Sequence, residues 1–391
     1  MRVSRADKSR LAAWWFTVDH TLLAAILMLV GAGLVLSLAA SPAVAEKKGL
    51  ATFYFAERHF LFAALGVAVM LAVSLLERAA VRRFALVLFV VALAGLIAVN
   101  LTGSEINGAR RWLRIGGHSL QPSEFAKPAF AVLMAWMFAE AQRRRDMPAL
   151  PIAVLTGVIL AGLLVAQPDV GQTLLVAGVW GAQFFLSGQP IIAAVGLVGV
   201  GALGLAAAYN IFPHVAGRVD RFLTPHIGDN TQVSRAIQSF TEGGFLGRGP
   251  GEGTIKTVLP DAHTDFIFAV VAEEYGVIAC LILLGIFAFI VLRAFFAASR
   301  EPDAATRLAI QGLALLFGFQ ALINMAVNVG LIPAKGMTLP YISAGGSSTI
   351  AISITLGMIL ALTRRRADLA HFKKPRLHPR VDFGGETGTA R

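Results

Sequence analysis

The sequence predicts an all-α polytopic membrane protein of about ten transmembrane helices, with a large extracytoplasmic loop between helices 7 and 8. Of its 391 residues, 56% are hydrophobic and 15% are charged, whereas soluble domains carry charge on roughly a quarter of their residues. Long apolar stretches follow one another along the chain, and Lys and Arg concentrate in every second loop. Together, these observations argue against an ordinary soluble domain.

The apolar stretches give the number of helices. About twenty apolar residues cross the hydrocarbon core of a bilayer as a helix, because lipid offers the backbone polar groups no partner outside the helix. The lone cysteine, Cys280, lies inside such a stretch as a small core residue, so a disulfide framework is excluded. We place the ten spans at residues 19–40, 59–77, 84–102, 124–141, 150–166, 170–188, 190–212, 266–293, 308–330 and 345–363.

The basic residues give the orientation. They precede the first span and follow the second, fourth, eighth and tenth, as in Arg143–Arg145 and Arg364–Arg366. Cytoplasmic loops are enriched in Lys and Arg, so both termini are predicted to be cytoplasmic. The net charge of +11 is then explained by attraction to anionic lipid, without a nucleic-acid partner. The loops 103–123, 213–265 and 331–344 are predicted to lie outside.

Three regions follow from this topology. Residues 1–18 form a basic cytoplasmic N-terminus, residues 19–363 form the membrane domain, and residues 364–391 form a basic disordered cytoplasmic tail. The first apolar stretch resembles a secretory signal, but it is longer than a signal's apolar region, so we expect a retained helix. Within the large loop 213–265, the apolar residues of 232–240 have helical spacing, which predicts a short interfacial helix.

The first outer loop and the start of the fourth span combine cations, an indole and a carboxylate. Trp112 fits a membrane-interface anchor, while the adjacent Arg111 fits bidentate phosphate binding as well. Glu124 and Lys127 are three residues apart, which favours a helix-surface ion pair. Because both lie at the mouth of a span, substrate contact stays equally open.

The ninth span carries a polar stripe. Gln320, Asn324 and Asn328 recur every four residues, so they share one helix face. The stripe fits either interhelical hydrogen bonding or the wall of a substrate cavity. Lys335 follows between two prolines on the same outer side, where either solvation or phosphate contact is consistent with its position.

Three further motifs have conventional interpretations. Asp169 stands at a tight turn, where it would cap the helix of the sixth span, 170–188. Glu273 and Glu274 lie two turns into the eighth span and require a polar partner that the sequence does not name. The glycine-rich segment 247–253 lacks the strand and helix of a nucleotide loop; it fits a loop whose backbone approaches a ligand, or a simple connector.

The segment before the eighth span is the most informative. Asp261, His263 and Asp265 crowd into five residues at the mouth of a span, where ionisable groups indicate a functional site. If the segment is helical, the two aspartates share a face and raise each other's pKa. Such a group suits general-base catalysis, with ion coupling in a transporter and helix capping as alternatives.

These motifs resemble the SEDS family (shape, elongation, division and sporulation) over roughly residues 15–365. The segment Lys335–Pro340 resembles the division-type member more than the elongation-type member. One departure is Ala344, where the family usually has Tyr. The resemblance rests on residues Gly108–Trp112, Gln121–Glu124, Gln167–Gly171, Leu259–Phe266 and Ile342–Ser348.

The resemblance implies a peptidoglycan glycosyltransferase that polymerises lipid II, an undecaprenyl-pyrophosphate-linked disaccharide-pentapeptide, into β-1,4-linked glycan during septal cell-wall synthesis. The family's catalytic aspartate falls on Asp265. The outer-side cations expected to meet the leaving pyrophosphate are Arg111, Lys127, Lys335 and Arg218, and the other expected substrate contacts are Trp112, Glu124 and His263. No cofactor is predicted with certainty. A divalent cation, Mg²⁺ or Mn²⁺, could help to neutralise the charge of the leaving group, although the sequence shows no recognisable set of metal ligands.

The resemblance also implies partners and a location. A class B penicillin-binding protein, which is a transpeptidase, and other divisome proteins are the expected partners in the inner membrane at the septum. Three alternatives stay open: a lipid II flippase, an elongation-type polymerase, and a non-catalytic scaffold. The sequence contains no ATP-binding motif, so a flippase would need ion coupling or a passive path.

Overall fold

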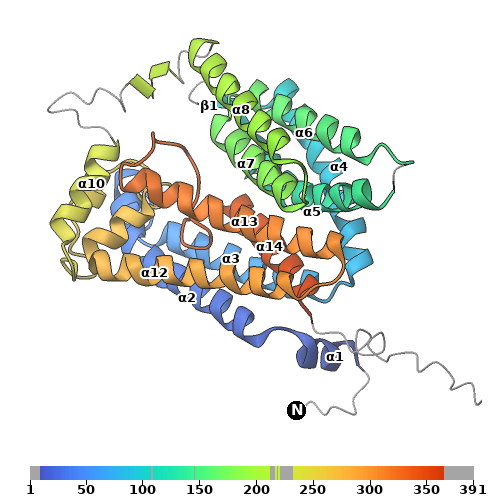
Figure 1. Cartoon of the computed structure of the whole chain (residues 1–391). Coiled ribbons are helices and arrows are strands. Elements are labelled where there is room, and N and C mark those ends of the chain that lie inside the picture. Colours follow the sequence, from blue (N-terminus) through green and yellow to red (C-terminus); the bar gives the residue numbers. More distant parts are fainter. Residues whose placement is uncertain are drawn as a thin grey trace, which may run out of the picture.

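The computed structural model describes residues 9–106, 109–144, 146–211, 216–217, 219–220 and 232–364. Ten helices of 17 residues or more run through these residues, and they form one bundle (Figure 1). The prediction of ten long helices is therefore confirmed within this part of the chain. The helices are α2 His20–Lys47, α3 Tyr54–Ser74, α4 Arg78–Thr102, α5 Pro122–Arg143, α6 Ala149–Ala166, α7 Val170–Leu186, α8 Ile191–Ile211, α12 Ile267–Ser299, α13 Ala304–Asn328 and α14 Gly346–Leu362.

Six of these helices, namely α2, α3, α4, α6, α12 and α13, are long and apolar enough to cross a membrane by length and composition. Helices α7 and α14 are shorter apolar helices. Large apolar side chains such as Leu101, Val91 and Val158 are more than half exposed on the outside of the bundle, as a lipid-facing surface requires. The chain is a multi-pass membrane protein.

Small elements complete the fold. A three-stranded antiparallel sheet, β1 Ser104–Ile106, β2 Ala109–Ile115 and β3 His118–Leu120, occupies the connection from α4 to α5. This sheet was not predicted. The remaining helices are α1 Arg10–Thr17, α10 Gln232–Gly243 and α11 Ile255–Val258, of which α10 confirms the short helix expected at 232–240.

Glycines let neighbouring helices and loops approach closely. A Cβ at Gly33 of α2 would overlap the carbonyl oxygen of Tyr341, and one at Gly66 of α3 would lie 2.5 Å from Oγ of Ser353 in α14. Helices α3 and α14 therefore pack along their lengths, which places the N-terminus of α14 beside that of α3. Small residues are the usual means of close helix packing inside membranes.

Both ends of the described chain lie at one end of the bundle (Figure 1). Nε of Arg364, just after α14, donates to Oγ1 of Thr17 at 3.0 Å. Arg293 pairs with Asp19 at 2.8 Å at the same end. The opposite end carries β1, α10 and the segment 329–345, and we call it the loop end.

Helix α12 breaks near the loop end at Gly276, whose φ of 78° and ψ of 175° are not helical. The glycine-rich segment fills the break: the amides of Arg248 and Gly249 donate to the carbonyls of Glu273 and Glu274 at 2.9 and 3.0 Å. The close backbone approach expected for this segment is therefore to α12. The backbone hydrogen bonds lost at the break are replaced by the loop, as buried backbone groups require.

The two buried glutamates of α12 also find their partners here. Glu273 accepts hydrogen bonds from the amides of Thr254, Ile255 and Lys256 at 2.5, 2.7 and 3.0 Å. Glu274 forms an ion pair with the ammonium of Lys256, and both side chains are buried. The same ammonium donates to the carbonyl of Ala39 in α2 at 3.3 Å. The outer piece of α12 is thus tied to α11 and α2.

Candidate functional site

Asp265 ends a series of turns that lead into α12. The carbonyl of Asp261 accepts from the amides of Thr264 and Phe266 at 3.0 and 3.2 Å, and Asp261 itself has a φ of 54°. The segment is therefore not an α-helix, so the conditional prediction that both aspartates share a helix face is wrong. Asp261 is exposed, whereas Asp265 is half-buried.

The polar stripe of α13 fixes the backbone of Asp265. Nδ2 of Asn324 and Nδ2 of Asn328 each donate to its carbonyl oxygen at 2.9 Å. Oδ1 of Asn328 accepts from the amide of Ala269 at 3.1 Å, in the first turn of α12. The stripe therefore makes interhelical hydrogen bonds, and those bonds hold the candidate base.

The Lys335–Gly336 segment lies between Asp265 and the first turn of α7. A Cβ at Gly336 would lie 3.2 Å from Oδ2 of Asp265. On the other side, a Cβ at Gly171 would lie 3.6 Å from Cδ of Lys335. The fold thus places the segment that carries Lys335 beside the carboxylate of Asp265, from positions about seventy residues apart in the chain.

Arg111 reaches the same turn from strand β2. One of its terminal nitrogens donates to the carbonyl of Pro168 at 2.7 Å, and its Nε lies 3.5 Å from Oδ2 of Asp169. Oδ1 of Asp169 accepts from the amide of Gln172 at 3.4 Å, which confirms the predicted cap of α7. Burial raises the pKa of Asp169 above its ordinary value, and the guanidinium of Arg111 opposes that shift.

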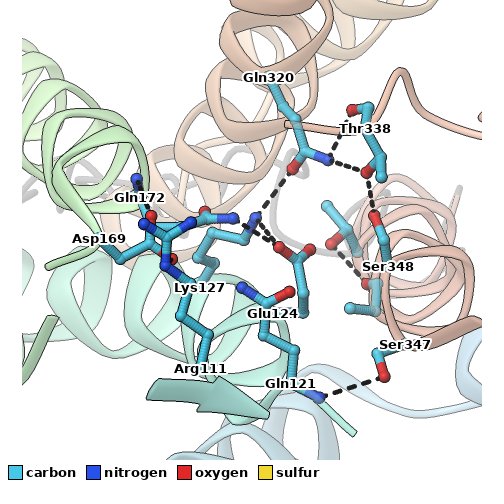
Figure 2. A network of polar contacts seen from close by, with 12 residues as sticks. Arg111, Gln121, Glu124, Lys127, Asp169, Gln172, Gln320, Thr338, Ser347 and Ser348 are labelled. Carbon is cyan, nitrogen blue, oxygen red and sulfur yellow. Dashed lines mark hydrogen bonds and ion pairs between the residues drawn. The ribbon is translucent and has the colours of Figure 1, made fainter. Parts of the chain in front are cut away.

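Glu124 and Lys127 form the predicted ion pair, with Nζ 3.0 Å from Oε1. Both side chains are nearly fully buried, and the ammonium also donates to Oε1 of Gln320 at 3.0 Å. Nε2 of Gln172 donates to the same Glu124 oxygen at 2.7 Å. Figure 2 shows these groups converging from α5, α7 and α13. Lys127 is therefore part of a connected network that joins α5, α7 and α13.

The network continues to α14 (Figure 2). Nε2 of Gln320 donates to the carbonyl of Thr338 at 3.1 Å, and the hydroxyls of Thr338 and Ser348 lie 2.5 Å apart. The amide of Gln121 donates to Oγ of Ser347 at 3.2 Å. The segment that carries Lys335 is consequently anchored on both α13 and α14.

The remaining predicted site residues lie elsewhere. Trp112 is half-buried and follows Arg111 on β2, so strand geometry directs it to the opposite face of the sheet. His263 is buried and packs against Phe55 of α3, with ring centroids 4.4 Å apart and the ring planes tilted by 50°. Arg218 lies outside the described residues.

Three residues of the site were not singled out from the sequence. Gln172, Thr338 and Ser348 are neutral polar side chains, and their roles depend on contacts between distant helices. A weak signal was available for Gln172, because it and Gln183 are amides inside an otherwise apolar span. Amides buried in a span indicate hydrogen bonding between helices.

The arrangement combines a half-buried carboxylate with cations on a rigid frame. Asp265 can accept a proton, and Lys335 and Arg111 can face an anion at the same end of the bundle. Within the described residues, no group of three or more His, Cys, Asp and Glu side chains is placed to hold a metal ion. This arrangement best fits a reaction in which a hydroxyl group attacks and an anionic group departs.

Comparison with known proteins decides the family. The family model of cell cycle proteins named for FtsW, RodA and SpoVE matches residues 20–368. The chain belongs to this family. It is the SEDS family that the sequence motifs resemble, so that resemblance is confirmed.

Curated FtsW/RodA/SpoVE relatives cover nearly the whole chain. It is 47% identical over 364 residues to a probable peptidoglycan glycosyltransferase FtsW of Caulobacter vibrioides, covering 93% of each chain. It is 36% identical to the corresponding protein of Trichlorobacter lovleyi, covering 88% of this chain and 93% of that one.

Solved structures of the family share the fold. A chain of a peptidoglycan synthase complex that coordinates polymerization and crosslinking is 30% identical, with a TM-score of 0.72 over 88% of this chain and 97% of that one. The rod shape determining protein RodA of Thermus thermophilus is also 30% identical, with a TM-score of 0.66 over 89% and 97%.

Proposed function

We propose that this protein is a peptidoglycan glycosyltransferase that polymerises lipid II into β-1,4-linked glycan strands. The observation that carries the proposal is the position of Asp265, whose carboxylate lies against the Lys335–Gly336 segment and whose carbonyl is fixed by two amides. The names of the FtsW relatives support the same activity.

The carboxylate of Asp265 acts as the general base. It accepts the proton of the 4-hydroxyl of the acceptor's N-acetylglucosamine, and that oxygen attacks C1 of the donor's N-acetylmuramic acid. The bond from C1 to the pyrophosphate oxygen breaks as the new glycosidic bond forms, so the configuration at C1 inverts. A positioned base typically contributes about 10²–10⁴-fold to such a step.

The departing pyrophosphate carries negative charge, which the cations Lys335 and Arg111 meet. Arg111 is rigidly held by Pro168 and Asp169, so little reorganisation is needed as charge develops. Lys127 is already paired with Glu124, and both residues stay predicted substrate contacts. Arg218, Trp112 and His263 stay predicted substrate contacts.

A divalent cation also stays a prediction. The described residues around Asp265 do not assemble a ligand set for one, and no step above is routed through it.

The reaction faces the outside of the membrane. The loop end is the outer end, and both termini are cytoplasmic, which the basic residues at the opposite end support. Alkaline phosphatase fused after residue 230 should be active, and the enzyme fused after residue 146 should not.

The setting is septal wall synthesis in the inner membrane. The segment Lys335–Pro340 and the FtsW relatives favour the division role over the elongation role. The partner is a class B penicillin-binding protein, together with other divisome proteins. A related chain belongs to a solved peptidoglycan synthase complex that coordinates polymerization and crosslinking, which supports a partner of this kind.

The experiment is polymerisation of purified lipid II by the purified chain in detergent, with and without the cognate transpeptidase. Glycan strands on a gel support the polymerase. Their absence in both conditions, alongside lipid II translocation in vesicles, would instead identify a flippase, since translocation has no meaning in detergent.

A further inference from the structure

Helix α12 consists of two pieces that meet at Gly276, and the shorter piece follows directly on the candidate base. We call residues 267–275 the outer piece; Asp265 lies two residues before it. The non-helical backbone of Gly276 interrupts the hydrogen bonds that keep a helix straight. The angle between the two pieces is therefore set by contacts with other parts of the chain.

Small changes of this angle move the base. At about 1.5 Å per residue, the nine residues of the outer piece span about 14 Å. A tilt of about 5° at Gly276 therefore displaces the start of the piece by about 1 Å. A misplacement of that size at a reacting group can lower a rate about 100-fold. A general base at this position requires a fixed angle at Gly276.

Helices α10 and α13 hold the start and the middle of the outer piece. Asn328 of α13 accepts from the amide of Ala269 at 3.1 Å. Helix α10 packs along the same piece (Figure 1), where a Cβ at Gly243 would overlap the carbonyl of Ala272. The end that adjoins Gly276 is held by a different neighbour.

The ammonium of Lys256 joins that end to α2. It forms an ion pair with Glu274, and it donates to the carbonyl of Gly251 at 3.1 Å and to the carbonyl of Ala39 in α2 at 3.3 Å. These three acceptors equal the number of N–H donors of an ammonium. Because both side chains of the ion pair are buried, salt screens the pair little. One side chain thus connects the outer piece, the glycine-rich segment and α2.

We propose that Lys256 is a positioning residue for glycan synthesis, which fixes the outer piece of α12 against α2 and thereby places Asp265 beside the Lys335–Gly336 segment. The proposal rests on the proposed function, in which Asp265 is the general base. Lys256 acts through the angle at Gly276 and touches no reacting atom. An apolar side chain in its place would fill the same space, but its packing is non-directional and would not fix that angle.

Two variants with opposite expected results separate position from stability. Lys256→Met with Glu274→Leu leaves no buried charge unpaired, so the chain stays folded, but the directed bond to α2 is lost. Its kcat for lipid II polymerisation should fall about tenfold to a hundredfold, with KM near that of wild type. Glu274→Gln keeps an acceptor for Lys256 and the bond to Ala39, so it should lower the thermal midpoint and leave kcat near that of wild type.

Arg248→Gln with Glu242→Gln is the matched control. It removes an ion pair of the same region whose side chains are 35% and 36% exposed, and it should change neither kcat nor the thermal midpoint. If Lys256→Met with Glu274→Leu does not fold, Lys256→Met with Glu274→Gln takes its place, with the same expected loss of kcat. Both of its new side chains are close in size to the original ones.

The position of the outer piece is measured without activity by the distance between two spin labels. Because Cys280 is the chain's one cysteine, Cys280→Ala provides the background for labels at Thr257→Cys in α11 and Thr102→Cys in α4, both exposed positions. Glu273 accepts from three amides at the start of α11, so the label at 257 follows the outer piece. The distance distribution should be narrow with Lys256 present and broader in the double variant.

Either of two results would overturn the proposal. One is a wild-type kcat in the folded double variant, which would leave Lys256 a stabilising residue only. The other is the same distance distribution with and without Lys256, which would show that the outer piece is held by other contacts. If wild type makes no glycan, the proposed function fails, while the spin-label distances still decide whether Lys256 holds the outer piece.

Discussion

Asn328 of α13 donates a hydrogen bond from its side chain to the main-chain carbonyl of Asp265 at 2.9 Å, across 63 residues of sequence. The same side chain accepts from Ala269 at 3.1 Å. One amide therefore joins the candidate base and the first turn of α12 to a neighbouring helix. Geometry held to within a fraction of an ångström is what a positioned base requires.

Asn328→Ala should lower both stability and activity, because it leaves the buried carbonyl of Asp265 with one donor and the amide of Ala269 with none. An unsatisfied buried group costs about 1–3 kcal/mol. Thermal unfolding and the polymerisation rate measure the two effects. Asn210→Ala removes a side chain that bonds within α8 and is exposed, so it should change neither; equal behaviour of the two variants would refute the positioning role.

Lys335→Ala should reduce polymerisation about tenfold to a hundredfold, since a hydrogen bond to a charged group contributes roughly 1.5–3 kcal/mol. Expression and thermal unfolding should stay near wild type, because Lys335 is only partly buried. An unchanged rate would show that Lys335 does not meet the leaving pyrophosphate.

Lys256→Met should destabilise the protein strongly, because it leaves Glu274 charged and buried without its partner. Removing one member of a buried ion pair typically costs about 3–5 kcal/mol. The double variant Lys256→Met with Glu274→Leu should recover much of the loss, since no buried charge is left unpaired. Thermal unfolding of the single and double variants measures this coupling, and purely additive losses would contradict it.

The stability of the protein should fall as the pH drops below about 6.5. In the unfolded chain His263 takes up a proton near its ordinary pKa of 6.5, whereas in the folded protein burial holds its pKa at about 4. The unfolded state therefore binds more protons between these values, so the free energy of unfolding decreases through this window and levels off below about pH 4. His263→Asn should flatten the dependence of the thermal midpoint on pH; an equally steep dependence would assign it to other groups.

The helices could be predicted because apolar length alone specifies a membrane span. All ten predicted spans overlap a helix of the structure, although α2 and α12 extend to Lys47 and Ser299, beyond the apolar runs. The bilayer constrains only the apolar part of a helix. The helix can continue beyond the bilayer, where water or loops satisfy its backbone polar groups.

The sheet was missed for a local reason. Strand β2 is Ala-Arg-Arg-Trp-Leu-Arg-Ile, and the charged residues obscured its pairing with the three-residue strands on either side. The turn Gly116–Gly117, with φ of 56° and 79°, was the available signal, because two such residues favour a tight hairpin.

The site was predictable in composition but not in arrangement. Asp265, Lys335, Arg111 and the α13 stripe were singled out from charge and polarity within apolar surroundings. Their convergence depends on contacts between α7, α12, α13 and the segment before α14, which no local pattern encodes. The same reason hid Lys256 as the partner of Glu274, since the pair joins α11 to α12.

The most direct test of the account is the rate of glycan synthesis by Asp265→Asn. This substitution keeps the size and hydrogen-bonding capacity of the side chain but removes its ability to accept a proton at neutral pH. Asp261→Asn is the matched control, because Asp261 is exposed and lies outside the network.

The measurement is polymerisation of lipid II by the two variants and wild type, with lipid II binding and transpeptidase recruitment followed in parallel. Asp265→Asn should bind lipid II and recruit its partner but lose about 10²–10⁴-fold in rate, while Asp261→Asn should stay near wild type. Polymerisation by Asp265→Asn at the wild-type rate would contradict the assignment of Asp265 as the general base.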